Sequence, residues 1–155
     1  MDFATTDLLL ASAHHILIFS IAAVLAFEVG VVRQGLTAVD IRRVAKVDAW
    51  YGILAALIIA VGFVRAIYAA KGWAYYSVNI FFWAKIIAFA IVGLLSVPPT
   101  IAYIRWRNAL KKDASFLPAP GVIASARRFL WMEVVVFAFI PIFAAAMARG
   151  YGMPS

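Results

Sequence analysis

The chain has 155 residues, of which 66% are hydrophobic and 14% are charged, and its net charge is +7. Soluble domains are about half apolar, and a domain this small keeps much of its surface exposed and cannot bury the excess. The natural solvent for that surface is lipid, so the composition excludes a soluble protein. It also argues against nucleic-acid binding, because the basic residues flank apolar runs and do not alternate with aromatic residues in a polar segment.

The chain contains no cysteine. This excludes disulfides, thiolate nucleophiles, iron–sulfur clusters and haem or metal held by cysteine. The N-terminal apolar run has no basic segment before it and is too long for a cleavable signal peptide. We therefore expect this run to be the first membrane helix.

Four apolar runs are long enough to cross a bilayer, which takes about 20 residues. Each is predicted to be a helix, because an unpaired strand cannot cross lipid. The helices are expected at 7–32, 47–70, 78–104 and 129–148. Because these spans are closely linked, consecutive helices should run antiparallel. The predicted fold is all-α: an integral membrane, antiparallel four-helix bundle that forms a single domain over residues 1–155.

The basic residues predict which side of the membrane each connection faces. The connection at 33–46 holds four of them and the connection at 105–128 holds six, ten in all. The opposite side has only Lys71 and Arg149. Basic loops stay in the cytoplasm, so both termini are expected in the opposite compartment.

Local signals add detail to the connections and spans. Thr37 is predicted to cap a short surface helix, and residues 117–121 form a turn-rich break. Ser125 is a candidate cap for the last membrane helix. Pro98-Pro99 and Pro141 should kink the helices that contain them, because proline removes a backbone hydrogen bond.

Ionisable residues inside the spans are costly in lipid and usually face the bundle interior. At 1.5 Å per residue, they fall at two depths. His14, Arg65 and Lys85 form a basic level near the end that carries the termini, with His15 next to His14. An acidic level near the other end consists of Glu28, Asp48 and Glu133.

Helical spacing predicts which of these side chains point inward. Asp7, His14 and Glu28 are separated by multiples of seven and share one stripe of the first helix. If Glu28 points inward, His14 does too, and His15 is rotated by about 100° toward a neighbour or the rim. Lys85 shares a stripe with other polar residues of the third span and is expected inside.

The basic level predicts a haem b or tetrapyrrole site, because neutral imidazole is an axial ligand of haem iron. His14 would ligate the metal, and Arg65 would hold a propionate, a group that arginine pairs with well. Lys85 would do the same or act as the second ligand. The two histidines are adjacent, which excludes a bis-histidine dihaem cytochrome.

Two other functions remain open. The two polar levels and the shared stripe are compatible with a small transporter or proton path. The third reading is a structural accessory subunit of a membrane complex, with polar pairs that lock the helices together. In that case the acidic level would pair with Arg33, Arg43 and Lys46. Lipid is the expected partner, whereas a homo-oligomer or a partner subunit is not decided, and no catalytic triad, phosphate loop or HExxH motif is present.

Four segments carry a resemblance that spans nearly the whole chain. They are residues 13–17 (AHHIL), 47–52 (VDAWYG), 82–85 (FWAK) and 95–100 (LSVPPT). They resemble an uncharacterised family of small bacterial inner-membrane proteins. The resemblance implies a multi-pass protein of the bacterial inner membrane, with both termini in the periplasm.

A more distant resemblance is to the CopD-like membrane proteins and the HemJ-type protoporphyrinogen oxidases. Those proteins have a histidine in the first helix and a Trp-x-Lys-like element in the third, and are thought to bind haem b. His14 or His15, with Trp83 and Lys85, would occupy the matching places. The Leu-Pro-Arg-rich stretch that follows the first helix of the HemJ-type proteins is absent, and residues 28–35 stand in its place.

Overall fold

The computed structural model describes residues 2–68 and 71–154, and this part of the chain is all-α. Four of its helices are long and apolar enough to cross a membrane, as predicted. A short fifth helix lies between the second and third spans. The helices are α1 (Phe3–Val31), α2 (Ala38–Tyr68), α3 (Gly72–Val78), α4 (Ile80–Lys112) and α5 (Pro120–Ala148).

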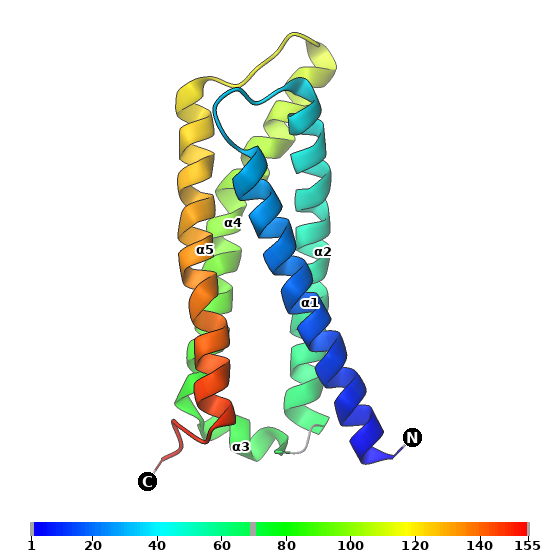
Figure 1. Cartoon of the computed structure of the whole chain (residues 1–155), viewed down its shortest axis with the longest axis vertical. Helices are drawn as coiled ribbons and strands as arrows, with labels where there is room; N and C mark the ends of the chain where they lie inside the picture. The colour runs from blue at the N-terminus through cyan, green and yellow to red at the C-terminus, as the bar shows by residue number, and fades with distance from the viewer. Residues whose placement is uncertain (1, 69–70, 155) are drawn as a thin grey trace.

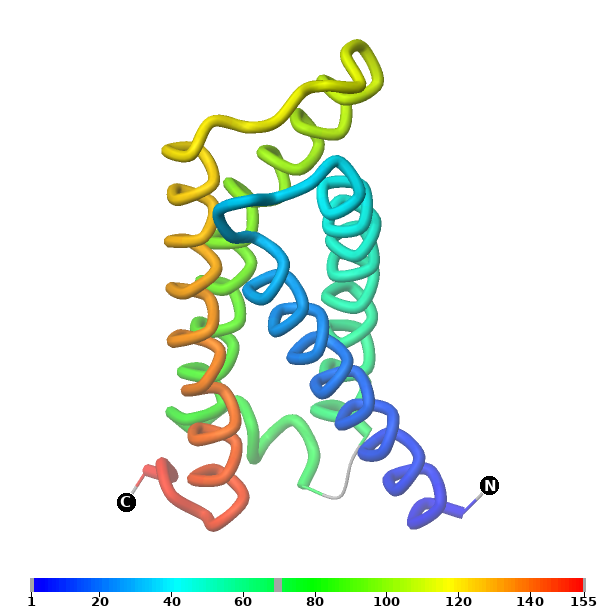
Figure 2. The backbone as a smooth tube through the Cα atoms, turned by 45° about the horizontal axis from the view of Figure 1, so that its top comes forward, coloured from blue at the N-terminus to red at the C-terminus, as the bar shows by residue number. Residues whose placement is uncertain are grey.

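The four long helices form two antiparallel pairs, α1 with α2 and α4 with α5 (Figure 1). The pairs are joined mainly between α2 and α4, with a smaller contact between α1 and α5. Helix α1 crosses the bundle diagonally, so its first turns stand away from α5 (Figure 2). Both ends of the chain lie at the end of the bundle that carries α3, which agrees with the predicted common side of the termini.

Helix α2 begins nine residues before the predicted span of 47–70, because a reciprocal cap starts it at Ala38. The backbone N–H of Asp40 donates to Thr37 Oγ1 at 3.2 Å, and the N–H of Thr37 donates to Asp40 Oδ2 at 3.0 Å. This pair satisfies two amides that a helix start otherwise leaves free. The predicted cap is confirmed, but the surface helix is continuous with the span. The predicted end at residue 70 lies outside the described residues.

Helix α4 is also longer than predicted, running from Ile80 to Lys112 where the apolar run ends near residue 104. Its last two turns carry the basic residues that project beyond the apolar region. Pro98 and Pro99 lie inside the continuous helix. In Figures 1 and 2 its C-terminal part leans toward the start of α2.

Helix α5 begins at Pro120 rather than near residue 129, so the prediction of Ser125 as its cap is wrong. Pro120 occupies the first helical turn, where a missing N–H costs nothing and the fixed φ favours the helix. Ala119 precedes it without a side-chain cap.

Helix α1, predicted over 7–32, begins four residues earlier, at Phe3. The side chain of Asp2 caps it, accepting a hydrogen bond from the Thr5 N–H at 2.8 Å.

Buried apolar side chains form two clusters along the bundle axis. The first lies toward the end with the basic connections and includes Leu25, Val32, Ile41, Val44, Tyr103, Trp106 and Leu130. The second lies toward the middle and consists of Ile21, Tyr51, Ile58, Ala88, Val92 and Ile140. Many large apolar side chains outside these clusters are exposed, and in a bilayer they contact lipid.

Arg127 caps the C-terminus of α1, a role that its place in a basic connection did not predict. Its Nη1 donates to the carbonyl oxygens of Val29 at 2.9 Å and Val32 at 2.7 Å. The last carbonyls of a helix lack intrahelical partners and carry partial negative charge, so a guanidinium satisfies both needs. This contact ties the start of α5 to the end of α1.

The short helix α3 occupies the connection between the second and third spans, where no helix was predicted. The Tyr75 hydroxyl donates to the carbonyl oxygen of Met147 at 3.0 Å, and Lys71 Nζ donates to the same hydroxyl at 3.2 Å. The helix is therefore attached to the end of α5.

The C-terminal tail folds back on the start of α4 through the fully buried side chain of Asn79. Its Oδ1 accepts hydrogen bonds from the N–H groups of Phe81 and Phe82, which caps α4. Its Nδ2 donates to the carbonyl oxygen of Tyr151 at 2.9 Å. One amide thus joins a helix start to the chain end.

Gly152 makes this docking sterically feasible, and replacing it with alanine should loosen the tail. A Cβ there would lie 2.6 Å from Phe81 Cδ2, at a φ of +81°. Gly150 has a similar φ of +84° but open space around its Cβ position. We expect Gly152→Ala to lower the free energy of unfolding by about 1–3 kcal/mol more than Gly150→Ala does, because only the former overpacks. Unfolding in detergent measures the free energy of unfolding of both variants. Equal losses in the two would contradict close packing of Gly152 against the start of α4.

Candidate functional site

Three carboxyl side chains from three helices meet in the interior of the bundle. Glu28 of α1, Asp48 of α2 and Glu133 of α5 are 4%, 8% and 1% exposed. Each is close enough to the other two for their charges to interact. Tyr51 of α2 and Tyr103 of α4 are likewise close enough to interact with all three. These five residues are called the acidic cluster below.

The acidic cluster is only partly hydrogen-bonded. The Tyr51 hydroxyl donates to Glu133 Oε2 at 3.3 Å, and Thr100 Oγ1 donates to Asp48 Oδ1 at 2.7 Å. Glu28 Oε1 and Glu133 Oε1 are buried without a hydrogen-bond partner. The Tyr103 side chain is fully buried, and its hydroxyl interacts with the Glu28 carboxyl. The cluster therefore has unused acceptor capacity at the two glutamates.

The predicted ion pairs to Arg33, Arg43 and Lys46 are absent from the described part of the chain, and that prediction is wrong. All three basic side chains are exposed, and no basic group is among the electrostatic neighbours of the three carboxyls. Because α2 is helical from Ala38, Lys46 is turned by about 200° from Asp48. Lys46 therefore points to the opposite side of α2 from the Asp48 carboxyl, although the two residues are close in the sequence.

The acidic cluster opens onto a groove between α2 and α4. The groove has a volume of about 460 Å³, and Asp48, Tyr51 and Thr100 contribute to its wall. Much of the remaining wall is formed by alanine and glycine residues, which keep the two helices from filling it. Arg107 lines it as well, with its Nε buried and unpartnered. Among the three carboxyls of the cluster, Asp48 is thus the one that lines this open space.

The basic level predicted from the sequence is also brought together in space. His14 of α1 lies within electrostatic range of Arg65 of α2 and Lys85 of α4, and Lys85 within that of Arg65. The imidazole packs on Gly62, where a Cβ would approach its Cε1 to 3.4 Å. His14 Nδ1 and Arg65 Nε are buried without a partner. These three side chains are called the basic group below.

His15 does not join the basic group. Its ring is exposed, perpendicular to that of His14 at a centroid distance of 6.4 Å, and its Nδ1 lies 2.7 Å from the carbonyl oxygen of Ala11. The expected orientations of the two histidines therefore agree with the structure. Trp83 is exposed as well and donates to the carbonyl oxygen of Ser77 at 2.9 Å. The assignment of these residues to a cofactor stays a prediction.

The two polar sites are separate. His14 and Glu28 lie 14 residues apart on one stripe of α1, a distance of about 21 Å along the helix. Ile21 lies midway between them and is 1% exposed. It packs in an apolar cluster with Ile58 and Val92, which separates the basic group from the acidic cluster.

The polar neighbours of the carboxyls were not predicted from the sequence. Tyr51 follows Asp48 by three residues, and Tyr103 follows Thr100 by three, so each pair shares a helix face. This spacing is visible in the sequence, but it does not single out Tyr51, because tyrosines near the ends of membrane helices are typical of the interfacial aromatic belt.

The fold and its buried polar residues define an integral membrane protein with four spans. The chain belongs to the family described as predicted membrane protein DUF2214, whose model matches residues 6–152. No curated protein and no solved structure matches the chain. The resemblance to an uncharacterised membrane family is thereby confirmed, and the resemblance to CopD-like and HemJ-type proteins stays a prediction.

Neutral substitutions in the acidic cluster test whether its carboxyls are charged and paired. We expect the free energies of unfolding of Glu28→Gln and Glu133→Gln to be at most about 1 kcal/mol below that of the unmodified protein, or to exceed it. The reason is that the amide keeps the shape of the carboxyl without a buried charge. Removing one partner of a buried ion pair instead costs about 3–5 kcal/mol. Unfolding in detergent distinguishes the two outcomes.

The control for this measurement is Ile140→Ala in the neighbouring apolar cluster. A cavity there should cost about 2–5 kcal/mol and shows that the assay detects a loss. If the glutamine variants lose as much free energy of unfolding as Ile140→Ala does, the carboxyls of the cluster are charged and paired, contrary to our expectation.

Proposed function

We propose that this protein carries protons within the membrane, as a proton path or a proton-coupled transporter. The observation that supports the proposal is the acidic cluster: three buried carboxyls from three helices, without a basic partner in the described residues. Ionisable groups inside membrane helices are expensive and usually functional.

Protons are the ligand that suits the cluster best. A buried carboxylate without a counter-charge is costly, and a protein relieves that cost by neutralising the group. Among the residues that the structure describes, no group of three histidine or acidic side chains is arranged to hold a metal ion. A protonated carboxyl becomes a donor, and the free oxygens of Glu28 and Glu133 offer acceptors for it.

The surroundings of the cluster supply a route on one side. Asp48 and Thr100 line the groove between α2 and α4, so protons would exchange with the cluster through Asp48. On the other side, His14 is the next titratable group on the same stripe of α1. Ile21 and its apolar neighbours separate the two in this structure, so transfer between them would require water or a movement of the helices.

The proposal includes an orientation. The termini and α3 share one end of the bundle (Figure 1), and ten of the basic residues belong to the connections at the other. By the charge bias of membrane loops, the basic end would face the cytoplasm and the termini the periplasm of a bacterial inner membrane. The groove and the acidic cluster would then communicate with the cytoplasm.

Proton flux into liposomes tests the proposal. Vesicles that contain the protein and a pH-sensitive dye should take up protons when a potassium diffusion potential is applied. We expect Glu28→Gln and Glu133→Gln to reduce this uptake to the level of empty vesicles, because an amide cannot exchange the proton.

The matched control is Asp113→Asn, which neutralises an exposed carboxyl just after α4 and should leave proton uptake unchanged. Wild-type vesicles no faster than empty ones, under any applied gradient, would contradict proton transport. A variant that carries both Glu28→Gln and Glu133→Gln and still takes up protons at the wild-type rate would contradict a role of the acidic cluster in transport.

A second candidate function is haem b binding at the basic group. It is favoured by the unpartnered imidazole of His14, with Arg65 and Lys85 in electrostatic range of it. An imidazole suits the iron, and the two cations suit the propionates. A bound haem would supply one-electron chemistry. The chain's own contribution would be to hold the His14 imidazole in place against Gly62 and to neutralise the propionates with Arg65 and Lys85.

The absorption spectrum of the protein purified in detergent tests this second candidate. We expect a Soret band that is abolished in His14→Ala, because the axial ligand is lost. His15→Ala is the matched control and should keep the band, since that ring points away from the basic group. A colourless protein from haem-replete cells would contradict haem binding and leave the proton proposal unaffected.

A further inference from the structure

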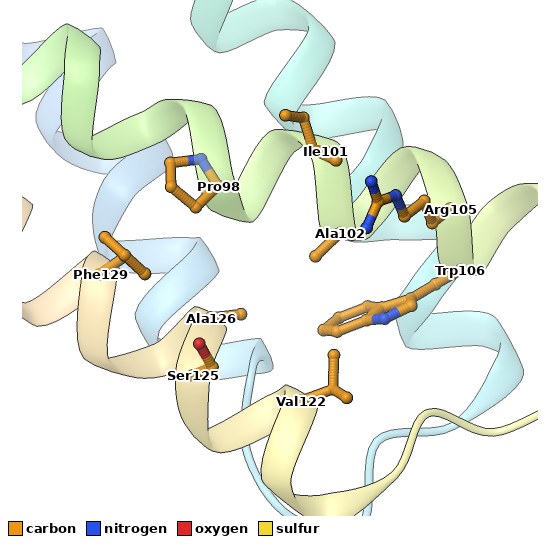
Figure 3. Close-up of a pocket in the computed structure, with 9 residues that line it drawn as sticks. All are labelled: Pro98, Ile101, Ala102, Arg105, Trp106, Val122, Ser125, Ala126 and Phe129. Atoms are coloured by element: carbon orange, nitrogen blue, oxygen red, sulfur yellow. The ribbon is translucent and has the colours of Figure 1, made fainter.

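A second cavity lies between α4 and α5, apart from the acidic cluster and the basic group (Figure 3). Its volume is about 190 Å³, and nine residues of the two helices line it. The side chains of Ala102 and Ala126 are too small to fill the space between the helices. Pro98 and Phe129 close one end, so the walls there are apolar.

Two polar side chains on opposite helices border this cavity, and one of them, Arg105, is positively charged. Figure 3 shows the Ser125 hydroxyl pointing into the hollow from α5 and the Arg105 guanidinium on the α4 side, next to Ala102. Both side chains are exposed. In the described part of the chain, neither has a hydrogen-bond partner, although α4 and α5 are the most closely packed pair. The indole of Trp106 extends into the same space.

We propose that this cavity binds an anionic phospholipid of the leaflet on the side of the basic connections. Arg105 and Ser125 would hold the phosphate, and the apolar wall at Pro98 and Phe129 would receive the start of an acyl chain. Guanidinium is the cationic group best suited to phosphate, and a headgroup with its chain matches a site with one charged and one apolar part.

The depth of the cavity agrees with this ligand. Arg105 lies seven residues before the end of α4, or about 10 Å along the helix. Trp106 lines the cavity next to Arg105, so its indole reports on a ligand at this level. A soluble phosphate would need no apolar wall, and a neutral lipid would need no guanidinium.

Quenching of Trp106 fluorescence by brominated lipid tests the proposal directly. The protein is placed in nanodiscs of phosphatidylcholine with a rising fraction of phosphatidylglycerol brominated on its acyl chains. To isolate Trp106, the other four tryptophans, all exposed, are replaced by phenylalanine: Trp50, Trp73, Trp83 and Trp131.

Brominated phosphatidylglycerol should quench Trp106 at lower mole fractions than brominated phosphatidylcholine does. We expect Arg105→Gln to weaken this preference about tenfold, as the loss of one charge-assisted hydrogen bond would. Arg128→Gln is the matched control, because Arg128 is an exposed cation of α5 that does not line the cavity. Ser125→Leu, which fills the hollow and keeps every charge, should also abolish the preference.

Three results would overturn the proposal. Equal quenching by the two lipids would show general contact with the bilayer. Equal effects of Arg105→Gln and Arg128→Gln would show attraction to the anionic surface only. Displacement of the quencher by inorganic phosphate would show a site for a soluble anion. Circular dichroism and gel filtration of each variant establish that it is folded before quenching is measured.

Discussion

The interior of a bilayer offers no hydrogen-bond partner, and the organisation of this protein follows from that constraint. Backbone groups in the spans pair within the helices, except where Pro98, Pro99 and Pro141 remove a donor, and several helix ends are closed by particular side chains. Asp2 and the Thr37–Asp40 pair cap helix starts, Asn79 caps α4, and Arg127 caps the end of α1. Two of these caps also join segments far apart in the sequence, so the capping contacts stabilise the tertiary structure as well.

The same constraint makes the acidic cluster the most unusual feature of the interior. It lies between two apolar clusters, with Tyr103 packed in one and Tyr51 in the other. A structural role alone would favour satisfied pairs, because a half-satisfied buried network is costly. Glu28 and Glu133 instead each keep a buried carboxyl oxygen that has no partner. In the proposed function, these oxygens would accept the protons that the cluster exchanges.

The basic group and the acidic cluster lie apart. No carboxylate is among the electrostatic neighbours of His14 and Lys85, and no cation is among those of Glu28 and Glu133. Apolar side chains around Ile21 lie between the two sites. The separation follows from geometry: α1 carries His14 and Glu28 on one stripe, but its diagonal course brings His14 against α2 and Glu28 between α2, α4 and α5 (Figure 2). Each end of the stripe therefore meets a different set of helices.

The four spans, their antiparallel order, the two polar levels and the inward position of His14 could all be predicted from the sequence. These depend on apolar run length and helical period, which are local properties. The predicted starts of α2 and α5 were wrong because helices continue beyond the apolar run once a cap or a proline permits it. Only the tertiary structure decided that Glu28, Asp48 and Glu133 meet each other rather than the nearby arginines and lysine. It also placed Tyr51 and Tyr103 with them and docked the tail at Gly152 on α4. The physical reason is that contacts between helices depend on how the helices cross, and a periodic pattern along one helix does not specify that crossing.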